Sequence, residues 1–179
     1  DHALIREGIK AALSGKDNYN IVGEMSDGVA CIEFLKQEPI DFILLDIDMP
    51  GKNGVEVGQW IKSMQLNVKI IYITSHVDFF SFYRAWQLNP SGFLFKENAL
   101  EEILTCLQQA EQGSRYFSPE TEAYLKSNQH LVKNFEAIHD KLSALSAKEK
   151  QILLHIANSK TTSEIADELF NSYKTIENH

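Results

Sequence analysis

The chain has 179 residues, of which 44% are hydrophobic and 23% are charged, so it can bury a core and is not of the disordered class. No apolar run is long enough to cross a membrane and no signal-peptide pattern occurs, so we expect a cytoplasmic protein without a membrane partner. Residues 1–140 hold 12 basic and 20 acidic side chains, whereas residues 141–179 hold 5 of each, so composition does not indicate nucleic-acid binding.

Strand-like and helix-like segments alternate along the first part of the chain. The predicted helices cover residues 3–13, 28–37, 55–65, 77–87 and 99–112, and the predicted strands cover 20–25, 41–46, 69–75 and 91–96. This alternation predicts βαβ units, hence an α/β fold with a parallel sheet covered on both faces. Cys31 and Cys106 lie in two of these helices without CxxC spacing, so we expect two reduced thiols.

Three of the predicted strands end in a residue that can do chemistry. Asp46 ends an apolar run and precedes the turn-forming pair Pro50-Gly51, Thr74 ends a β-branched strand, and Lys96 follows a short strand. Ligands of open parallel sheets bind beyond the carboxyl ends of the strands, so we expect these three side chains to converge. An aspartate in that position can hold a metal ion, act as a nucleophile, or do both.

A helical linker is predicted between the alternating region and the C-terminal part. Gly113 can stop the preceding helix, and Ser118-Pro119 predicts a new helix through about Ser127. An apolar stripe at helical spacing follows, which we expect to lie on one of the domains or on a partner chain; it consists of Leu131, Phe135, Ile138 and Leu142.

Two capping boxes mark the C-terminal part. Ser146-x-x-Glu149 and Thr161-x-x-Glu164 each open a helix, and a break near Ser172 precedes a third helix in which Ile176 faces inward. Two helices joined by a few residues are typical of a helix-turn-helix, although any small helical bundle would show the same capping.

The strand-end residues Asp46, Thr74 and Lys96, with Pro50-Gly51 after the first, resemble the receiver domain of two-component response regulators. Residues 145–153 and 164–179 resemble the LuxR-type helix-turn-helix of the NarL/FixJ subfamily. The resemblance implies a flavodoxin-like receiver over residues 1–112, a partly helical linker over 113–144, and an all-α DNA-binding domain over 145–179.

The receiver fold implied by the resemblance has five parallel strands, and the first of them would precede Asp1. In the flavodoxin-like order that strand lies in the interior of the sheet, beside the strand that ends at Asp46. The chain also stops at His179, within the recognition helix. We therefore expect these residues to be a portion of a longer protein, with an incomplete helix-turn-helix domain.

The resemblance implies that Asp46 accepts a phosphoryl group while Thr74 and Lys96 contact the phosphoryl oxygens. A magnesium ion would be held by Asp1, Asp46 and the backbone carbonyl of Asp48. Phe93 matches the family's aromatic switch position, where the ring fills the space that Thr74 vacates. His76, two residues beyond Thr74, matches a position near the attacking water.

The implied protein is a non-enzymatic transcription factor that receives its phosphoryl group from a sensor histidine kinase. It would form a homodimer when phosphorylated and bind double-stranded operator DNA. In the recognition helix, phosphate contacts are expected from Lys174 and Thr175, whereas base-edge contacts are expected from Glu177 and Asn178, with His179 as a further DNA-binding residue.

Two alternative functions remain open on the sequence. Asp46-Ile-Asp48 also resembles the nucleophile and general acid of haloacid-dehalogenase-type phosphatases, although the following Met49-Pro50 departs from that pattern. The second alternative is a pseudo-receiver that acts without phosphorylation as a dimerisation module. The presence of Asp46, Thr74 and Lys96 together argues against the pseudo-receiver.

Overall fold

The computed structural model describes residues 3–16, 18–75 and 78–179, and the chain divides into two compact units, residues 1–128 and 129–179. The division between the units falls inside the predicted linker. The elements of the first unit are α1 (Ala3–Leu13), α2 (Gly28–Leu35), β1 (Phe42–Asp46), α3 (Gly54–Ser63), β2 (Lys69–Thr74), α4 (Phe79–Gln87), β3 (Gly92–Phe95), α5 (Ala99–Glu111), β4 (Tyr116–Phe117) and α6 (Pro119–Ser127). Those of the second are α7 (Gln129–Ala144), α8 (Ala147–Ala157), α9 (Thr162–Glu168) and α10 (Tyr173–Asn178).

The sheet of the first unit is parallel, in the order β1-β2-β3-β4, which confirms the predicted α/β class. In its register Asp46 is the neighbour of Ile73 and Thr74 is the neighbour of Phe95. The carboxyl ends of β1, β2 and β3 therefore lie at one edge, where the sequence places its acid, hydroxyl and ammonium groups.

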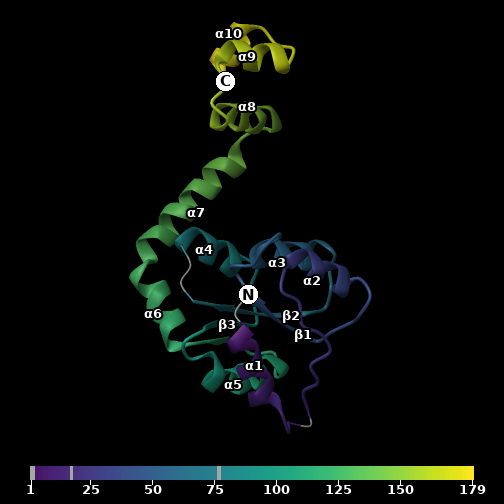
Figure 1. The fold of residues 1–179 in the computed structure, drawn as a ribbon. Helices are drawn as coiled ribbons and strands as arrows, with labels where there is room; N and C mark the ends of the chain where they lie inside the picture. The colour runs from purple at the N-terminus through teal and green to yellow at the C-terminus, as the bar shows by residue number, and fades with distance from the viewer. Residues whose placement is uncertain (1–2, 17, 76–77) are drawn as a thin grey trace. The chain divides into compact units, whose positions relative to one another are not determined.

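Helices cover both faces of this sheet (Figure 1). Helices α2, α3 and α4 enclose one core, which takes Tyr72 of β2 and Phe93 of β3. Helices α1 and α5 enclose the other core, which takes Ile73 and Leu94 from the same two strands. Successive strand residues point to opposite faces, so alternate residues of each β-branched or aromatic run belong to the two cores.

The predicted strand at residues 20–25 is wrong, because this segment runs without strand pairing in the structure. No described strand lies beside this segment to form a hydrogen-bonded ladder with it, and a strand requires such a partner. Conversely, the two-residue strand β4 was not predicted. The sheet of the described residues thus has four strands, and two of the five expected strands are not among them.

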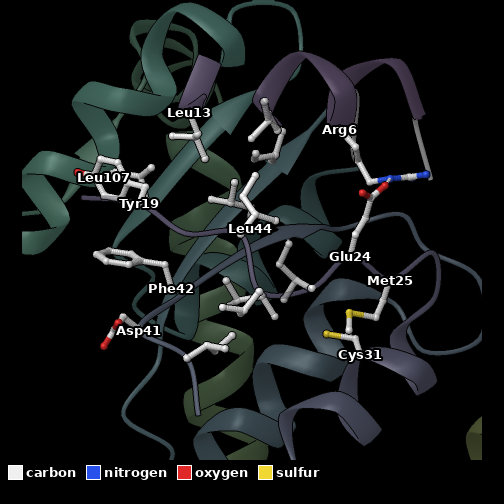
Figure 2. Close-up of a pocket in the computed structure, with 18 of the residues that line it drawn as sticks. Arg6, Leu13, Tyr19, Glu24, Met25, Cys31, Asp41, Phe42, Leu44 and Leu107 are labelled. Carbon is white, nitrogen blue, oxygen red and sulfur yellow. Dashed lines mark hydrogen bonds and ion pairs between the residues drawn. The ribbon is translucent and has the colours of Figure 1, made fainter. Parts of the chain in front are cut away.

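A cavity of about 710 Å³ lies along the unpaired edge of β1 (Figure 2). Its walls come from β1, α1 and the segment 20–25, with Leu44 and Met25 among the lining residues and an ion pair between Arg6 and Glu24 at one side.

The cysteines lie in different cores, as free thiols. Burial raises the pKa of the Cys31 thiol to about 11 and that of the Cys106 thiol to about 12, so both are protonated near neutral pH. Over residues 3–16, 18–75 and 78–179, no helix has the length and apolar character needed to cross a membrane.

The second unit is held by a small core and by its helix caps. The predicted capping boxes are present: Ser146 and Glu149 cap α8, and Thr161 and Glu164 cap α9. Ile176 of α10 is buried, as predicted. The buried core of this unit consists of Ile152, Ile165, Ala166 and Ile176.

Candidate functional site

The structure brings Asp46, Thr74 and Lys96 together at the carboxyl edge of the sheet. The ammonium Nζ of Lys96 donates to Oδ2 of Asp46 at 2.5 Å, and the backbone N–H of Lys96 donates to the carbonyl of Thr74 at 2.7 Å. The two charged side chains are only 8% and 12% exposed, for Lys96 and Asp46 respectively. A cation is thus held against the carboxylate in a poorly hydrated position, where charge interactions are stronger than in water.

The hydroxyl of Thr74 is an unpaired hydrogen-bonding group at this edge. Thr74 is fully buried, and its Oγ1 has no hydrogen-bond partner within the described ranges. Buried hydroxyls are normally paired, because leaving one unpaired costs about 1–3 kcal/mol. A further acceptor oxygen beside Asp46 would satisfy this hydroxyl.

The loop after Asp46 aims its carboxylate. The backbone N–H of Asp48 donates to Oδ1 of Asp46 at 3.1 Å, while Lys96 binds the other oxygen. Asn53 then caps α3 through a capping box with Glu56. These contacts hold both oxygens of the carboxylate, which lies between a strand end and a capped helix.

Two glycines let the backbone close tightly around this loop. A Cβ atom on Gly54 would lie 2.1 Å from the carbonyl oxygen of Asp46, and one on Gly28 would lie 1.9 Å from the carbonyl oxygen of Lys52. Both distances are impossible for a carbon side chain, so only glycine allows these approaches. The N-terminus of α2 thus packs directly on the loop that follows Asp46.

Possible metal ligands are few in the described part of the site. The carboxylate of Asp46 and the backbone carbonyl of exposed Asp48 are oxygen donors of the kind that Mg²⁺ prefers. Within residues 3–16, 18–75 and 78–179, no group of three His, Cys, Asp or Glu side chains could hold a metal ion. Asp1, the third predicted ligand, and His76 lie outside the described residues.

Phe93, the predicted switch residue, is fully buried. Its ring centroid lies 5.6 Å from that of Tyr72 and 4.6 Å from that of Phe82 on α4. The ring is therefore part of the core that also takes Tyr72, and α4 covers it.

Contacts of α6 with β3 are a feature that the sequence did not predict. Ser118, the cap of α6, donates its backbone N–H to the carbonyl of Phe93 at 3.1 Å, and Oγ1 of Thr121 donates to the same carbonyl at 3.1 Å. Ser118-Pro119 predicted the start of this helix but gave no indication of its docking place. The aromatic Tyr124, one turn further, was the available signal for a buried face.

The predicted DNA-contacting residues lie on or beside α10. Lys174, Glu177, Asn178 and His179 are exposed. Thr175 is half-buried, and its hydroxyl is 2.7 Å from that of the cap residue Ser172. The structure thus presents four of the five predicted residues to solvent, opposite buried Ile176.

Comparisons with known proteins agree with this geometry. Residues 1–108 match the family model described as the response regulator receiver domain, and residues 143–179 match that of the bacterial regulatory proteins of the luxR family. The Fimbriae Z protein of Escherichia coli K12 is 32% identical over 178 residues, which are 99% of this chain and 82% of that protein. The probable transcriptional regulatory protein NarL of Mycobacterium tuberculosis H37Rv is 32% identical over 179 residues, which are 100% of this chain and 81% of that protein.

Solved structures give the same pattern. A structure of two RcsB dimers bound to two parallel DNAs matches with a TM-score of 0.65 and 25% identity, covering 99% of this chain and 83% of that one. The receiver domain of the NarL regulator of M. tuberculosis matches with a TM-score of 0.57 and 36% identity, covering 63% of this chain and 90% of that domain.

Proposed function

Because the chain belongs to the response regulators that join a receiver domain to a LuxR-type DNA-binding domain, we propose that it accepts a phosphoryl group on Asp46 and thereby controls DNA binding. The observation that carries this proposal is the contact of Lys96 Nζ with Asp46 Oδ2 beside the unpaired buried hydroxyl of Thr74. We propose the domain boundaries that the sequence predicts: a receiver over 1–112, a linker over 113–144 and a DNA-binding domain over 145–179.

Phosphoryl transfer to Asp46 needs an oriented nucleophile and neutralised phosphoryl oxygens. A carboxylate oxygen of Asp46 forms the new P–O bond while the P–N bond of a kinase phosphohistidine breaks. The ammonium of Lys96 then pairs with one phosphoryl oxygen, and the hydroxyl of Thr74 donates to another. Both groups lie at the ends of neighbouring strands, on the edge of the sheet where the transfer would take place.

Magnesium is the proposed cofactor, and the donors present fit it. The proposed ligands are the carboxylates of Asp46 and Asp1 and the backbone carbonyl of Asp48, which leaves positions for the waters that Mg²⁺ retains. When bound, Mg²⁺ neutralises charge on the carboxylates and on the phosphoryl oxygens. Addition of a chelator should therefore abolish labelling by a phosphodonor.

Labelling with a small phosphodonor tests the site assignment. Asp46→Asn should abolish formation of the acyl phosphate, whereas Lys96→Ala should still accept phosphate but fail to switch the DNA-binding domain. Asp48→Asn is the matched control: the proposed role uses its backbone carbonyl, so labelling should persist. Labelled Asp46→Asn protein would refute the proposal.

The same experiment separates the alternatives. A phosphatase using Asp46 and Asp48 would release phosphate rapidly in the wild type and lose that turnover in Asp48→Asn. A pseudo-receiver would not be labelled. Membership among transcription-regulating response regulators favours a non-enzymatic protein.

DNA is the proposed ligand of α10, with the relatives' names and the DNA-bound RcsB structures as support. Lys174 and Thr175 would contact phosphates, Glu177 and Asn178 would face the base edges, and His179 would be a further DNA-binding residue. Lys174→Ala should weaken specific and non-specific binding alike and flatten the salt dependence. In site selection with Glu177→Ala, unchanged base preference with uniformly tighter binding would make Glu177 a repulsive charge and remove it from readout.

A sensor histidine kinase is the proposed phosphodonor, acting in the cytoplasm, and a homodimer is the proposed DNA-binding form. Two-fold operators match two-fold proteins, and the RcsB structure contains dimers bound to DNA. Sedimentation with and without a phosphoryl mimic measures this step. A phosphorylated monomer that binds its operator tightly would contradict it.

A further inference from the structure

A continuous stack of aromatic rings joins the strand of the switch residue to helix α6. The ring of Phe93 lies 4.6 Å from Phe82, and Phe82 lies 4.8 Å from Tyr124 of α6 in an edge-on arrangement. Phe95, the neighbour of Thr74 in the sheet register, has its ring 6.1 Å from Tyr124. Tyr124 is therefore linked directly to the ring of Phe95, and through Phe82 to the ring of Phe93.

A buried polar contact fastens the same helix to the same strand. Ser118 and Thr121 are fully buried, and both donate to the carbonyl of Phe93. Their hydroxyl oxygens are also 2.9 Å apart. Buried hydrogen bonds of this kind hold a unique geometry, because breaking one leaves a desolvated carbonyl. The first turn of α6 is thus tied to the backbone of the switch residue.

Thr74 lies on the side of the sheet where these rings pack. It is two residues beyond Tyr72 on β2, so its side chain points to the same face as Tyr72 and Phe93. A displacement of Thr74 toward a phosphoryl group on Asp46 would leave a void in this close-packed core. Cores respond to such voids by repacking neighbouring side chains, since an unfilled void forfeits dispersion contacts.

We infer that α6 is the output helix of the switch: its docking on β3 through Tyr124, Ser118 and Thr121 is coupled to the position of Thr74. The inference rests on the proposed phosphorylation of Asp46. Repacking of Phe93 and Phe82 withdraws the surface on which Tyr124 rests and loosens α6. In sequence, α6 is followed at once by α7 and then by the DNA-binding helices, so its loosening acts on the segment that carries them.

Thermodynamic reciprocity turns this inference into a measurable number. If a phosphoryl mimic on Asp46 loosens α6, it binds more tightly when α6 is undocked, so weakening the docking of α6 must tighten binding of the mimic, by at most the coupling factor. The variant Tyr124→Leu removes the ring stack, and the nearly isosteric Thr121→Val removes one of the two bonds to the Phe93 carbonyl. We expect each to bind beryllofluoride with Mg²⁺ more tightly by about fivefold or more, the lower range of typical coupling.

The experiment uses the full chain and two readouts. Beryllofluoride is titrated in the presence of Mg²⁺ while tryptophan fluorescence is followed, and amide hydrogen exchange of residues 118–127 is measured with and without the mimic. Tyr116→Leu is the matched control, since Tyr116 is also a half-buried tyrosine but packs in the core between α5 and the other face of the sheet. It should leave both readouts as in the wild type.

The outcomes separate the inference from the proposed function. Faster exchange of α6 on binding, with tighter binding in Tyr124→Leu and Thr121→Val, supports the inference. Normal beryllofluoride binding with unchanged α6 exchange, or with unchanged or weaker affinity in both variants, overturns it. Failure of the wild type to bind, or equal binding by Asp46→Asn, refutes the proposed function instead. If Tyr124→Leu melts early, Thr121→Val alone decides.

Discussion

The two units of the chain are stabilised in different ways. In the first, a parallel sheet holds two cores with large, fully buried side chains such as Tyr72, Phe82 and Phe93. In the second, four buried side chains suffice, and each of α8, α9 and α10 begins at a side-chain cap. Cores stabilise in proportion to buried apolar area, whereas caps contribute locally.

The two units also differ in how far their candidate functional residues are exposed. Asp46 and Lys96 are nearly buried at the ends of two strands of one sheet, a fixed and poorly hydrated setting that suits the phosphoryl chemistry proposed for them. Lys174, Glu177 and Asn178 are exposed on a short helix, where they can reach a ligand as large as DNA. Core substitutions should therefore lower the free energy of unfolding most in the first unit, and substitutions in the second unit should lower it less.

The largest effect is expected in the first core. Phe93→Ala removes a fully buried ring and should lower the free energy of unfolding of the first unit by about 3–5 kcal/mol, a large part of a typical domain's stability. Both tryptophans, Trp60 and Trp86, lie in this unit, so urea unfolding followed by tryptophan fluorescence reports it alone.

Phe80→Ala is the control for this prediction. Phe80 is 51% exposed on α4, so its loss should cost less than about 1 kcal/mol. Equal urea midpoints for the two variants would show that Phe93 does not belong to the core that stabilises this unit.

A smaller total effect is expected from the second core. Ile165→Ala should cost about 2–5 kcal/mol and unfold the second unit, because it removes one of only four buried side chains. In this variant, the unfolding transition of the second unit should be missing from the far-UV circular dichroism signal, while the transition followed by tryptophan fluorescence keeps its midpoint. Ile156→Ala, at a residue 55% exposed on α8, should change neither. A shift of the tryptophan midpoint in Ile165→Ala would mean that the units do not unfold independently.

The smallest effect is expected at a cap. Thr161→Ala should cost the second unit about 1 kcal/mol at neutral pH, measured by circular dichroism, whereas the adjacent Thr162→Ala should cost less because Thr162 is not the cap residue. Hydrogen bonds from the backbone and hydroxyl of Thr161 lower the pKa of Glu164. This contribution is therefore present above the ordinary glutamate pKa and lost as the pH falls through the lowered one.

Acid should thus narrow the gap in the free energy of unfolding between wild type and Thr161→Ala, because protonated Glu164 is a weaker acceptor for the Thr161 hydroxyl in the wild type. A gap that widens on acidification would contradict the capping-box account.

Local signals in the sequence were enough for much of the fold. The apolar runs ending at Asp46 and Thr74 predicted two strands correctly to within a residue, and Ser146 and Thr161 predicted two helix starts, because a cap is a contact between residues three apart. The convergence of Asp46 with Lys96 was also predictable, since parallel strands end at one edge.

Features that depend on distant partners were not predictable in the same way. The segment 20–25 has the composition of a strand, but a strand exists only with a neighbour to pair with. Likewise, nothing local to Ser118 or Thr121 specifies that both bind the carbonyl of Phe93, at least 25 residues away. That contact is decided by the surface that α4 and β3 form together.

The close backbone approaches at Gly28 and Gly54 have a consequence for how the protein can diverge. They fix the path of the loop after Asp46 through main-chain atoms, while the side chains of Asp48, Pro50 and Lys52 stay exposed. The exposed positions can therefore change without moving the carboxylate of Asp46. Because Gly28 and Gly54 fix the loop through backbone contacts, substitutions at its exposed positions should leave the position of Asp46 unchanged.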